Sequence, residues 1–155
     1  MPATDRKIND SRFPLRPGSS LDGLIHIGGA SFLSGHYTAD DLRASREAGG
    51  IFECLVLMHL DAMARLMTPR PGVFYWRTTT GHEVDFVIEQ GRKILPIEVK
   101  LTGRPRHADI RNLRMFMNEY PEADLGLLVH TGSDVVYLDK DIAAIPWNFL
   151  AGVSL

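Results

Sequence analysis

The stretch VFYWRTTTGHEVDFVIEQGRKILPIEVKL, residues 73–101, decides the fold class of this 155-residue chain. It consists of three runs rich in aromatic and β-branched residues, separated by Gly81 and by Gln90-Gly91. Runs of this kind, bounded by turn residues, are typical of β-strands. We therefore predict three consecutive strands at residues 73–80, 82–89 and 93–101, joined by tight hairpins.

The regions on both sides of this stretch predict the rest of the domain. Apolar residues recur at helical spacing within 51–67 and within 110–120, and prolines follow both segments. Two further strands are predicted at 125–130 and 135–138, and the residues around Pro146-Trp147 form an apolar tail. The order α-β-β-β-α-β with a final strand predicts an α/β domain with a central mixed β-sheet flanked by helices.

We expect one domain over residues 47–155, preceded by an irregular N-terminal arm at 1–46. The arm contains Pro14, Pro17 and Ser19-Ser20, and then a short apolar stretch, Leu24–Ile27, closed by Gly28-Gly29. We therefore expect it to contain one short helix or strand.

Composition narrows the function classes. Hydrophobic residues make up 45% of the chain, but no run approaches the ~18–20 apolar residues that span a bilayer. The polar N-terminus lacks the apolar core of a secretory signal. Cys54 is the single cysteine, which excludes an internal disulfide and a zinc site built from cysteines. We expect a cytoplasmic protein that does not enter membranes.

The charges are unevenly distributed. A net charge of −2 and a pI near 6.3 argue against a protein that holds nucleic acid by bulk charge. Basic residues nevertheless gather within fifteen positions, where only Asp109 interrupts them. They form either a local binding stripe or an ordinary solvated surface. The basic residues are Lys100, Arg104, Arg106, His107, Arg111 and Arg114.

The alternation of side chains along a strand divides 82–89 and 93–101 into two faces. A turn at Gln90-Gly91 predicts that Glu83 faces Glu98 on the neighbouring strand. The predicted apolar face contains Val84, Phe86, Ile88, Leu95, Ile97, Val99 and Leu101. The predicted charged face contains Glu83, Asp85, Glu98 and Lys100.

Three carboxylates on adjacent strands repel one another. A divalent cation removes this conflict, because Mg²⁺ prefers hard oxygen ligands and typically takes one or two carboxylates. Lys100 is two residues from Glu98 on the same face, where an ammonium can orient a metal-bound water. The alternative is a solvated face on which Lys100 neutralises Glu98.

With GHEVDFVI followed by PIEVK, the sequence resembles the PD-(D/E)XK nuclease superfamily, whose signature is an acidic residue on one strand and (D/E)-x-K on the next. Here these are Asp85 and Glu98-Val99-Lys100. The likeness, from about Gly49 through Leu150, is to one branch in particular. That branch is the domain of unknown function found C-terminal to AAA-type ATPase modules in many prokaryotic ATP-binding proteins.

This resemblance implies a restriction-endonuclease-like core and a site for Mg²⁺ or Mn²⁺. Asp85 and Glu98 would bind the ion together with the carbonyl of Val99. Glu53, in the first core helix, would complete the shell or help to hold a second ion. Lys100 would position the attacking water. The implied reaction is hydrolysis of a phosphodiester bond in DNA.

The substrate and the partners are predicted more coarsely. Arg77, Arg104 and Arg106 are predicted to contact the substrate, because guanidinium groups suit phosphate. No G-x-x-x-x-G-K-[ST] loop is present, so we expect either a fragment of an AAA-type ATPase or a stand-alone relative. A non-catalytic module that recognises nucleic acid or protein for such an ATPase is the alternative, and a homodimer is a third option.

Overall fold

The computed structural model describes residues 12–14 and 48–151, with side chains from 48 to 150. Most of the predicted arm at 1–46, with its boundary, lies outside these residues. No helix of the described part is long and apolar enough to cross a bilayer. The elements in chain order are β1 (Arg12–Pro14), α3 (Ala48–Leu66), β2 (Gly72–Arg77), β3 (Glu83–Gln90), β4 (Lys93–Lys100), η1 (His107–Ile110), α4 (Arg111–Glu119), β5 (Gly126–His130), β6 (Val136–Asp139), β7 (Ile142–Pro146) and α5 (Asn148–Ala151).

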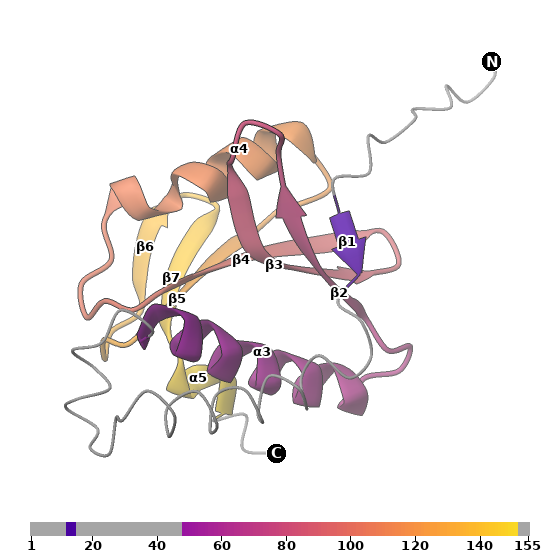
Figure 1. Ribbon diagram of the computed structural model, residues 1–155, viewed down its shortest axis with the longest axis horizontal. Helices are drawn as coiled ribbons and strands as arrows, with labels where there is room; N and C mark the ends of the chain where they lie inside the picture. The colour runs from indigo at the N-terminus through magenta and orange to yellow at the C-terminus, as the bar shows by residue number, and fades with distance from the viewer. Residues whose placement is uncertain (1–11, 15–47, 152–155) are drawn as a thin grey trace.

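The strands form one seven-stranded mixed sheet in the order β1-β2-β3-β4-β5-β7-β6. Strands β1, β2, β3 and β4 pair antiparallel in that order, β4 with β5 and β5 with β7 are parallel pairs, and β6 is antiparallel to β7. Helix α4 lies over one face of the sheet, and α3 with α5 lies over the other (Figure 1). The predicted α/β class, with a central mixed sheet between helices, is confirmed.

Each face of the sheet has its own apolar core. Helix α3 buries Phe52, Val56 and Leu60, which are four residues apart and therefore lie on one helical face. Leu113 and Phe116 of α4 do the same on the other side. Fully burying such a side chain contributes roughly 1.5–3 kcal/mol. The sheet residues packed with α3 are Phe86, Ile97, Val99 and Val129, and those packed with α4 include Trp76, Val84, Val87 and Leu128.

The turn between β3 and β4 differs from the prediction. Gln90 pairs with Lys93, so the two turn residues are Gly91 and Arg92 rather than Gln90 and Gly91. Gly91 has φ of 64°, and no described non-glycine residue has a positive φ. A two-residue turn with a positive φ only at its first position needs glycine there. The predicted register is therefore wrong by two residues, which leaves the assignment of alternate side chains to faces unchanged except where the strand bulges.

Strand β7 was not predicted, because Ile142–Pro146 was interpreted as part of an apolar tail. This strand inserts between β5 and β6 and is parallel to β5. Its sequence IAAIP is a continuous short apolar run, and all five residues are buried or half-buried. A strand covered on both faces lacks the alternation that identifies a half-exposed strand.

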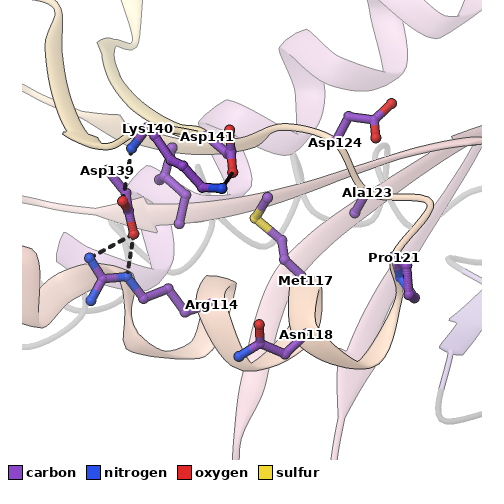
Figure 2. A pocket seen from close by; sticks show the side chains of 10 residues that line it. Arg114, Met117, Asn118, Pro121, Ala123, Asp124, Asp139, Lys140 and Asp141 are labelled. Carbon is purple, nitrogen blue, oxygen red and sulfur yellow. Dashed lines mark hydrogen bonds and ion pairs between the residues drawn. The ribbon is translucent and has the colours of Figure 1, made fainter.

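The turn that joins β6 to β7 is fastened to α4. The carboxylate of Asp139 accepts hydrogen bonds from Arg114 and from the backbone N–H of Lys140, all at 2.8 Å. These residues line an open groove of about 580 Å³ between α4 and the turn (Figure 2). The ion pair fixes the end of β6 against the helix, and it leaves Lys140 on the outside.

Candidate functional site

An irregularity in β3 determines where Asp85 lies. Phe74 of β2 pairs with Val87, but Trp76 pairs with Val84. One residue of β2 is thus opposite two residues of β3, which is a β-bulge. The bulge shifts the alternation of side chains between the two faces of the sheet. Val84 packs with the α4 core, whereas Phe86, two residues later, packs with the α3 core. The prediction that Val84 and Phe86 share one face is therefore wrong.

Asp85 is held at the bulge by the neighbouring strand. Its Oδ2 accepts a hydrogen bond of 2.7 Å from the backbone N–H of Val99. The regular pairing of β3 with β4 runs from the hairpin turn as far as Phe86 and Ile97, so it stops just before Asp85 is reached. Burial raises the pKa of Asp85, against the opposing effects of this hydrogen bond and of the Lys100 charge. Asp85 and Glu98 are the next residues beyond this pairing of β3 with β4, so the two carboxylates lie close together.

Glu98 is a buried carboxylate that is only partly neutralised. The Nζ of Lys100 is 2.7 Å from Glu98 Oε1, and the Glu98 side chain is 3% exposed. Its Oε2 has no hydrogen-bond partner in the described part of the chain. Burial and then the Asp85 charge raise the pKa of Glu98 to about 7, although Lys100 opposes this shift.

Lys100 is 41% exposed and interacts electrostatically with Glu98, Asp85 and Glu53. Burial disfavours its charged form, but the hydrogen bond to Glu98 and the charges of Glu98, Asp85 and Glu53 together raise its pKa. Lys100 is therefore an ammonium at neutral pH. Such a group orients water or stabilises negative charge, but it does not accept a proton.

Glu53 faces this group from α3. It follows the buried Phe52 by one position, so its carboxylate is at the border of the helix–sheet contact. Burial, followed by the charge of Asp85, raises the pKa of Glu53, and Lys100 opposes the shift. The structure therefore brings Glu53, Asp85, Glu98 and Lys100 into one electrostatic group.

The donor atoms fit a hard cation in part. Two neighbouring carboxylates and one main-chain carbonyl are within the usual ligand set of Mg²⁺, which keeps several waters. The unpartnered Glu98 Oε2 is an acceptor without a donor. Among the described residues, however, no three His, Cys, Asp or Glu side chains are grouped so that they could hold a metal ion. The predicted participation of Glu53 and of the Val99 carbonyl in binding an ion stays a prediction.

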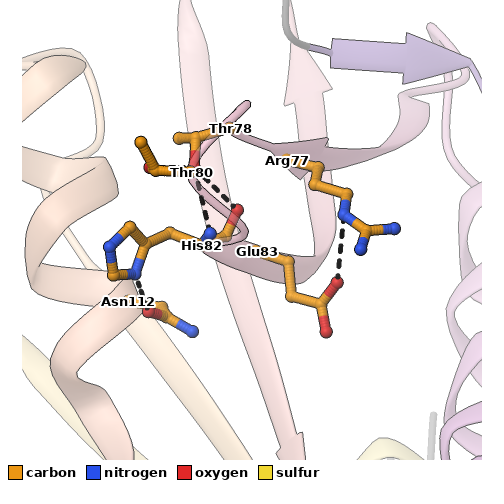
Figure 3. Close-up of polar contacts among 6 residues, drawn as sticks. All are labelled: Arg77, Thr78, Thr80, His82, Glu83 and Asn112. Atoms are coloured by element: carbon orange, nitrogen blue, oxygen red, sulfur yellow. Dashed lines mark hydrogen bonds and ion pairs between the residues drawn. The ribbon is translucent and has the colours of Figure 1, made fainter.

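Arg77 is the last residue of β2. Its Nε is 3.8 Å from Glu83 Oε2, and both side chains are more than half exposed. Figure 3 shows this pair pointing away from His82, whose ring turns toward α4 and lies 3.3 Å from Asn112 Oδ1. Arg77 pairs with Glu83 across β2 and β3. On the other side of β3, the register with β4 runs from Gln90 and Lys93 to Phe86 and Ile97, so Glu83 is not opposite Glu98 as predicted.

Arg104 and Arg106 lie in the loop after β4 and are exposed. Their backbone N–H groups are bonded to Thr102 Oγ1 at 3.2 Å and to Asp109 Oδ2 at 2.7 Å. Neither guanidinium forms an ion pair within the described ranges, 12–14 and 48–150. The loop conformation is thus fixed through the main chain, and the two charges face solvent.

His130 was not singled out from the sequence. It pairs with Lys100 across the parallel strands and is 1% exposed. The N–H of Gly132 donates to its Nδ1 at 3.0 Å, and burial lowers the pKa of His130. A Cβ at Gly132 would come within 2.5 Å of the Gly103 carbonyl. A single histidine at the end of a predicted strand gives no sequence signal that it will be buried beside Lys100.

Among solved structures, the chain is similar to one in an assembly of Thermococcus gammatolerans McrB AAA+ hexamers with bound McrC, at 12% identity and a TM-score of 0.43. The likeness covers 63% of this chain and 27% of that one. No curated protein matches the chain.

A family profile matches residues 48–150, which include the whole sheet from β2 to β7 and all the acidic residues described above. The match covers well over half of the sequence. The chain therefore belongs to the family described as a domain of unknown function, DUF4143.

Proposed function

We propose that this chain is a metal-dependent phosphodiesterase of the PD-(D/E)XK type that hydrolyses DNA. The observation that carries the proposal is Glu98, a buried carboxylate with an unpartnered oxygen beside Asp85 and Lys100. Leaving a buried carboxylate oxygen without a hydrogen-bond donor is costly. A cation bound at Glu98 Oε2 and Asp85 would offset this cost, which supports the proposal.

The roles are those that the resemblance to the PD-(D/E)XK superfamily implies. Asp85, Glu98 and the carbonyl of Val99 would hold Mg²⁺ or Mn²⁺, which would polarise a phosphoryl oxygen and lower the pKa of a bound water. Lys100 carries a positive charge and orients the attacking water. Glu53 extends the negative charge of the site on the α3 side. Arg77, Arg104 and Arg106 contact phosphates of the DNA backbone.

A second function is favoured by a different observation. The described residues contain no set of three side chains placed to hold a metal, and Lys100 already occupies one oxygen of Glu98. A non-catalytic module that recognises nucleic acid or protein for an AAA-type ATPase requires no metal. In that case the acidic group would be neutralised by Lys100 and by protonation.

Calorimetric titration of Mn²⁺ and Mg²⁺ separates the two functions without a choice of substrate. We expect one binding event in the wild type, its loss in Asp85→Asn, and wild-type binding in Asp124→Asn, which changes an exposed aspartate on the α4 side. Equal binding by the wild type and Asp85→Asn would contradict the site.

Activity is measured with single-stranded, duplex and branched DNA in Mn²⁺. We expect cleavage by the wild type, and its loss in both Asp85→Asn and Glu98→Gln. Equal cleavage by Asp85→Asn assigns the activity elsewhere. Binding that survives EDTA and is unchanged in Glu98→Gln, without cleavage, supports the recognition module.

A further inference from the structure

A second groove, of about 630 Å³, lies along η1 and α4. We call it the η1 groove, and the polar side chains that line it are His107, Arg111, Arg114 and Asn118. None of the described residues that line it is acidic. Pockets for small ligands are concave and mostly apolar. A groove with a cationic, exposed lining suits an extended polyanion instead.

The acidic residue nearest to this groove in the sequence is already bonded. Asp109 is half-buried in η1, and its Oδ2 accepts a hydrogen bond of 2.7 Å from the backbone N–H of Arg106. The carboxylate thus stabilises the first turn and does not line the groove. Arg111 is exposed and forms no ion pair with any described residue. Its guanidinium is therefore available to an anion.

Arg114 separates the η1 groove from the groove beside the turn between β6 and β7, since it lines both. Its Nε and Nη2 are each 2.8 Å from Asp139 Oδ2, which fixes the guanidinium. On the far side, Asp124, Asp139 and Asp141 outnumber the basic residues Arg114 and Lys140 (Figure 2). A polyanion is therefore attracted on the η1 side of Arg114 and repelled on the other side.

The η1 groove begins close to the end of the sheet that carries the acidic group. Asn112, in the first turn of α4, has its Oδ1 3.3 Å from Nδ1 of His82 (Figure 3). His82 immediately precedes β3, and Asp85 is three residues further along the chain. A polyanion that lies along α4 from Asn118 to Arg111 is therefore directed toward the candidate metal site.

We propose that the η1 groove binds the phosphate backbone of duplex DNA and holds it on the η1 side of Arg114. Duplex DNA carries one negative charge per ~1.7 Å of its axis, which complements a groove lined by basic residues alone. Arg111 and His107 contact phosphates, and such contacts fix the position of a duplex without reading its sequence. The inference deepens the proposed function and rests on it for the identity of the polyanion.

Charge reversal tests the groove, with fluorescence anisotropy of a labelled duplex in EDTA as the measurement. We expect Arg111→Glu to weaken binding by about tenfold at low salt. Glutamate suits the first turn of a helix, so α4 is expected to stay folded, and circular dichroism checks this. Arg92→Glu is the matched control, an equal charge change at an exposed residue of the turn between β3 and β4. Equal losses in the two variants, or a wild type that does not bind the duplex, would overturn the proposal.

A gain of affinity provides a test that loss of folding cannot imitate. Ala108 lines the groove and is exposed, so we expect Ala108→Lys to tighten binding by about threefold at low salt. Ala62→Lys, at an exposed position of α3 on the other face of the sheet, is the control and is expected to leave the affinity nearly unchanged. The same affinity in both lysine variants would place the DNA elsewhere.

The groove and the proposed metal site fail separately. We expect Asp85→Asn to bind the duplex in EDTA as tightly as the wild type. Cleavage that requires Asp85, together with binding that ignores Arg111→Glu, would overturn the groove and leave the proposed function intact. Binding that depends on Arg111 in a chain that neither binds Mn²⁺ nor cleaves DNA would support the groove and overturn the proposed phosphodiesterase.

Discussion

Glu98 links stability to pH. Its pKa is about 7 in the folded chain, chiefly because of burial, against an ordinary value of 4.5. The folded state therefore binds this proton more tightly than the unfolded state does. The contribution of the protonated carboxyl to stability is complete below about pH 4.5 and is lost as the pH rises through 7.

Glu98→Gln is therefore expected to raise the free energy of unfolding at pH 8 when no divalent ion is present. Glutamine keeps the size of the side chain but carries no charge. The gain at pH 8 relative to pH 4.5 is expected to be at most about 3 kcal/mol, from the difference between the two pKa values. Urea unfolding across this pH range measures it. Glu122→Gln, which changes an exposed glutamate, is the control and is expected to show no such trend.

Lys100 is expected to act on the reaction rather than on ion binding. Its Nζ forms an ion pair with Glu98 Oε1, so a bound cation would compete with Lys100 for this oxygen. We expect Lys100→Gln to bind Mn²⁺ at least as tightly as the wild type and to lower kcat for DNA cleavage by about 10²–10³. Calorimetry and single-turnover kinetics separate the two quantities. Loss of Mn²⁺ binding in this variant would assign Lys100 to the ion's own shell.

At the scale of the elements, the hairpin between β3 and β4 holds Asp85 near Glu98. Gly91 begins its turn with φ of 64°, a conformation that is unfavourable for residues with a Cβ. We expect Gly91→Ala to lower the free energy of unfolding by about 1 kcal/mol. Gly103→Ala is the matched control, because a Cβ there meets no atom within 4 Å. Equal losses in the two variants would show that the turn does not limit the hairpin.

The sequence predicted most of the elements because their patterns are local. Helical spacing from Phe52 to Leu60 and the composition of β2, β3 and β4 were sufficient for that. The turn was predicted one residue too early because both Gln90-Gly91 and Gly91-Arg92 are residue pairs that suit a two-residue turn. Only the backbone conformation of Gly91 distinguishes them. Strand β7 was missed because a strand buried on both faces shows no alternation of apolar and polar residues.

Alternation grouped Asp85 with Glu98 and Lys100, but it did not reveal the bulge beside Asp85. Strict alternation would place Val84 and Phe86 on the same face, whereas the bulge puts them on opposite faces of the sheet. The spacing of Glu98 and Lys100 within one strand was enough to predict that they share a face, and their ion pair agrees with the alternative in which Lys100 neutralises Glu98. The position of His130 opposite Lys100 depends on a parallel pairing between strands distant in sequence, which no local pattern encodes.

For the whole molecule, the local distribution of charge matters more than the net charge of −2. The segment from Lys100 to Arg114 contains five Lys or Arg residues and one Asp, so its formal charge is +4. Arg114 is paired with Asp139, and Lys100 with Glu98. The other arginines of the segment have no ion pair within the described residues, which leaves them for a polyanion.

Binding of DNA is therefore expected to depend on salt through a few contacts. Each phosphate contact made by Lys or Arg adds about 0.9 to the slope of log affinity against log salt concentration for duplex DNA. We expect Arg104→Gln with Arg106→Gln to lower the magnitude of this slope by about two. Arg65→Gln is the control, because Arg65 is held by Asp61 at 2.8 Å on α3. Fluorescence anisotropy at several salt concentrations, in EDTA to prevent cleavage, gives the slopes. An unchanged slope in the double variant would place the DNA on another surface, since the loop keeps its main-chain hydrogen bonds when only the guanidinium groups are removed.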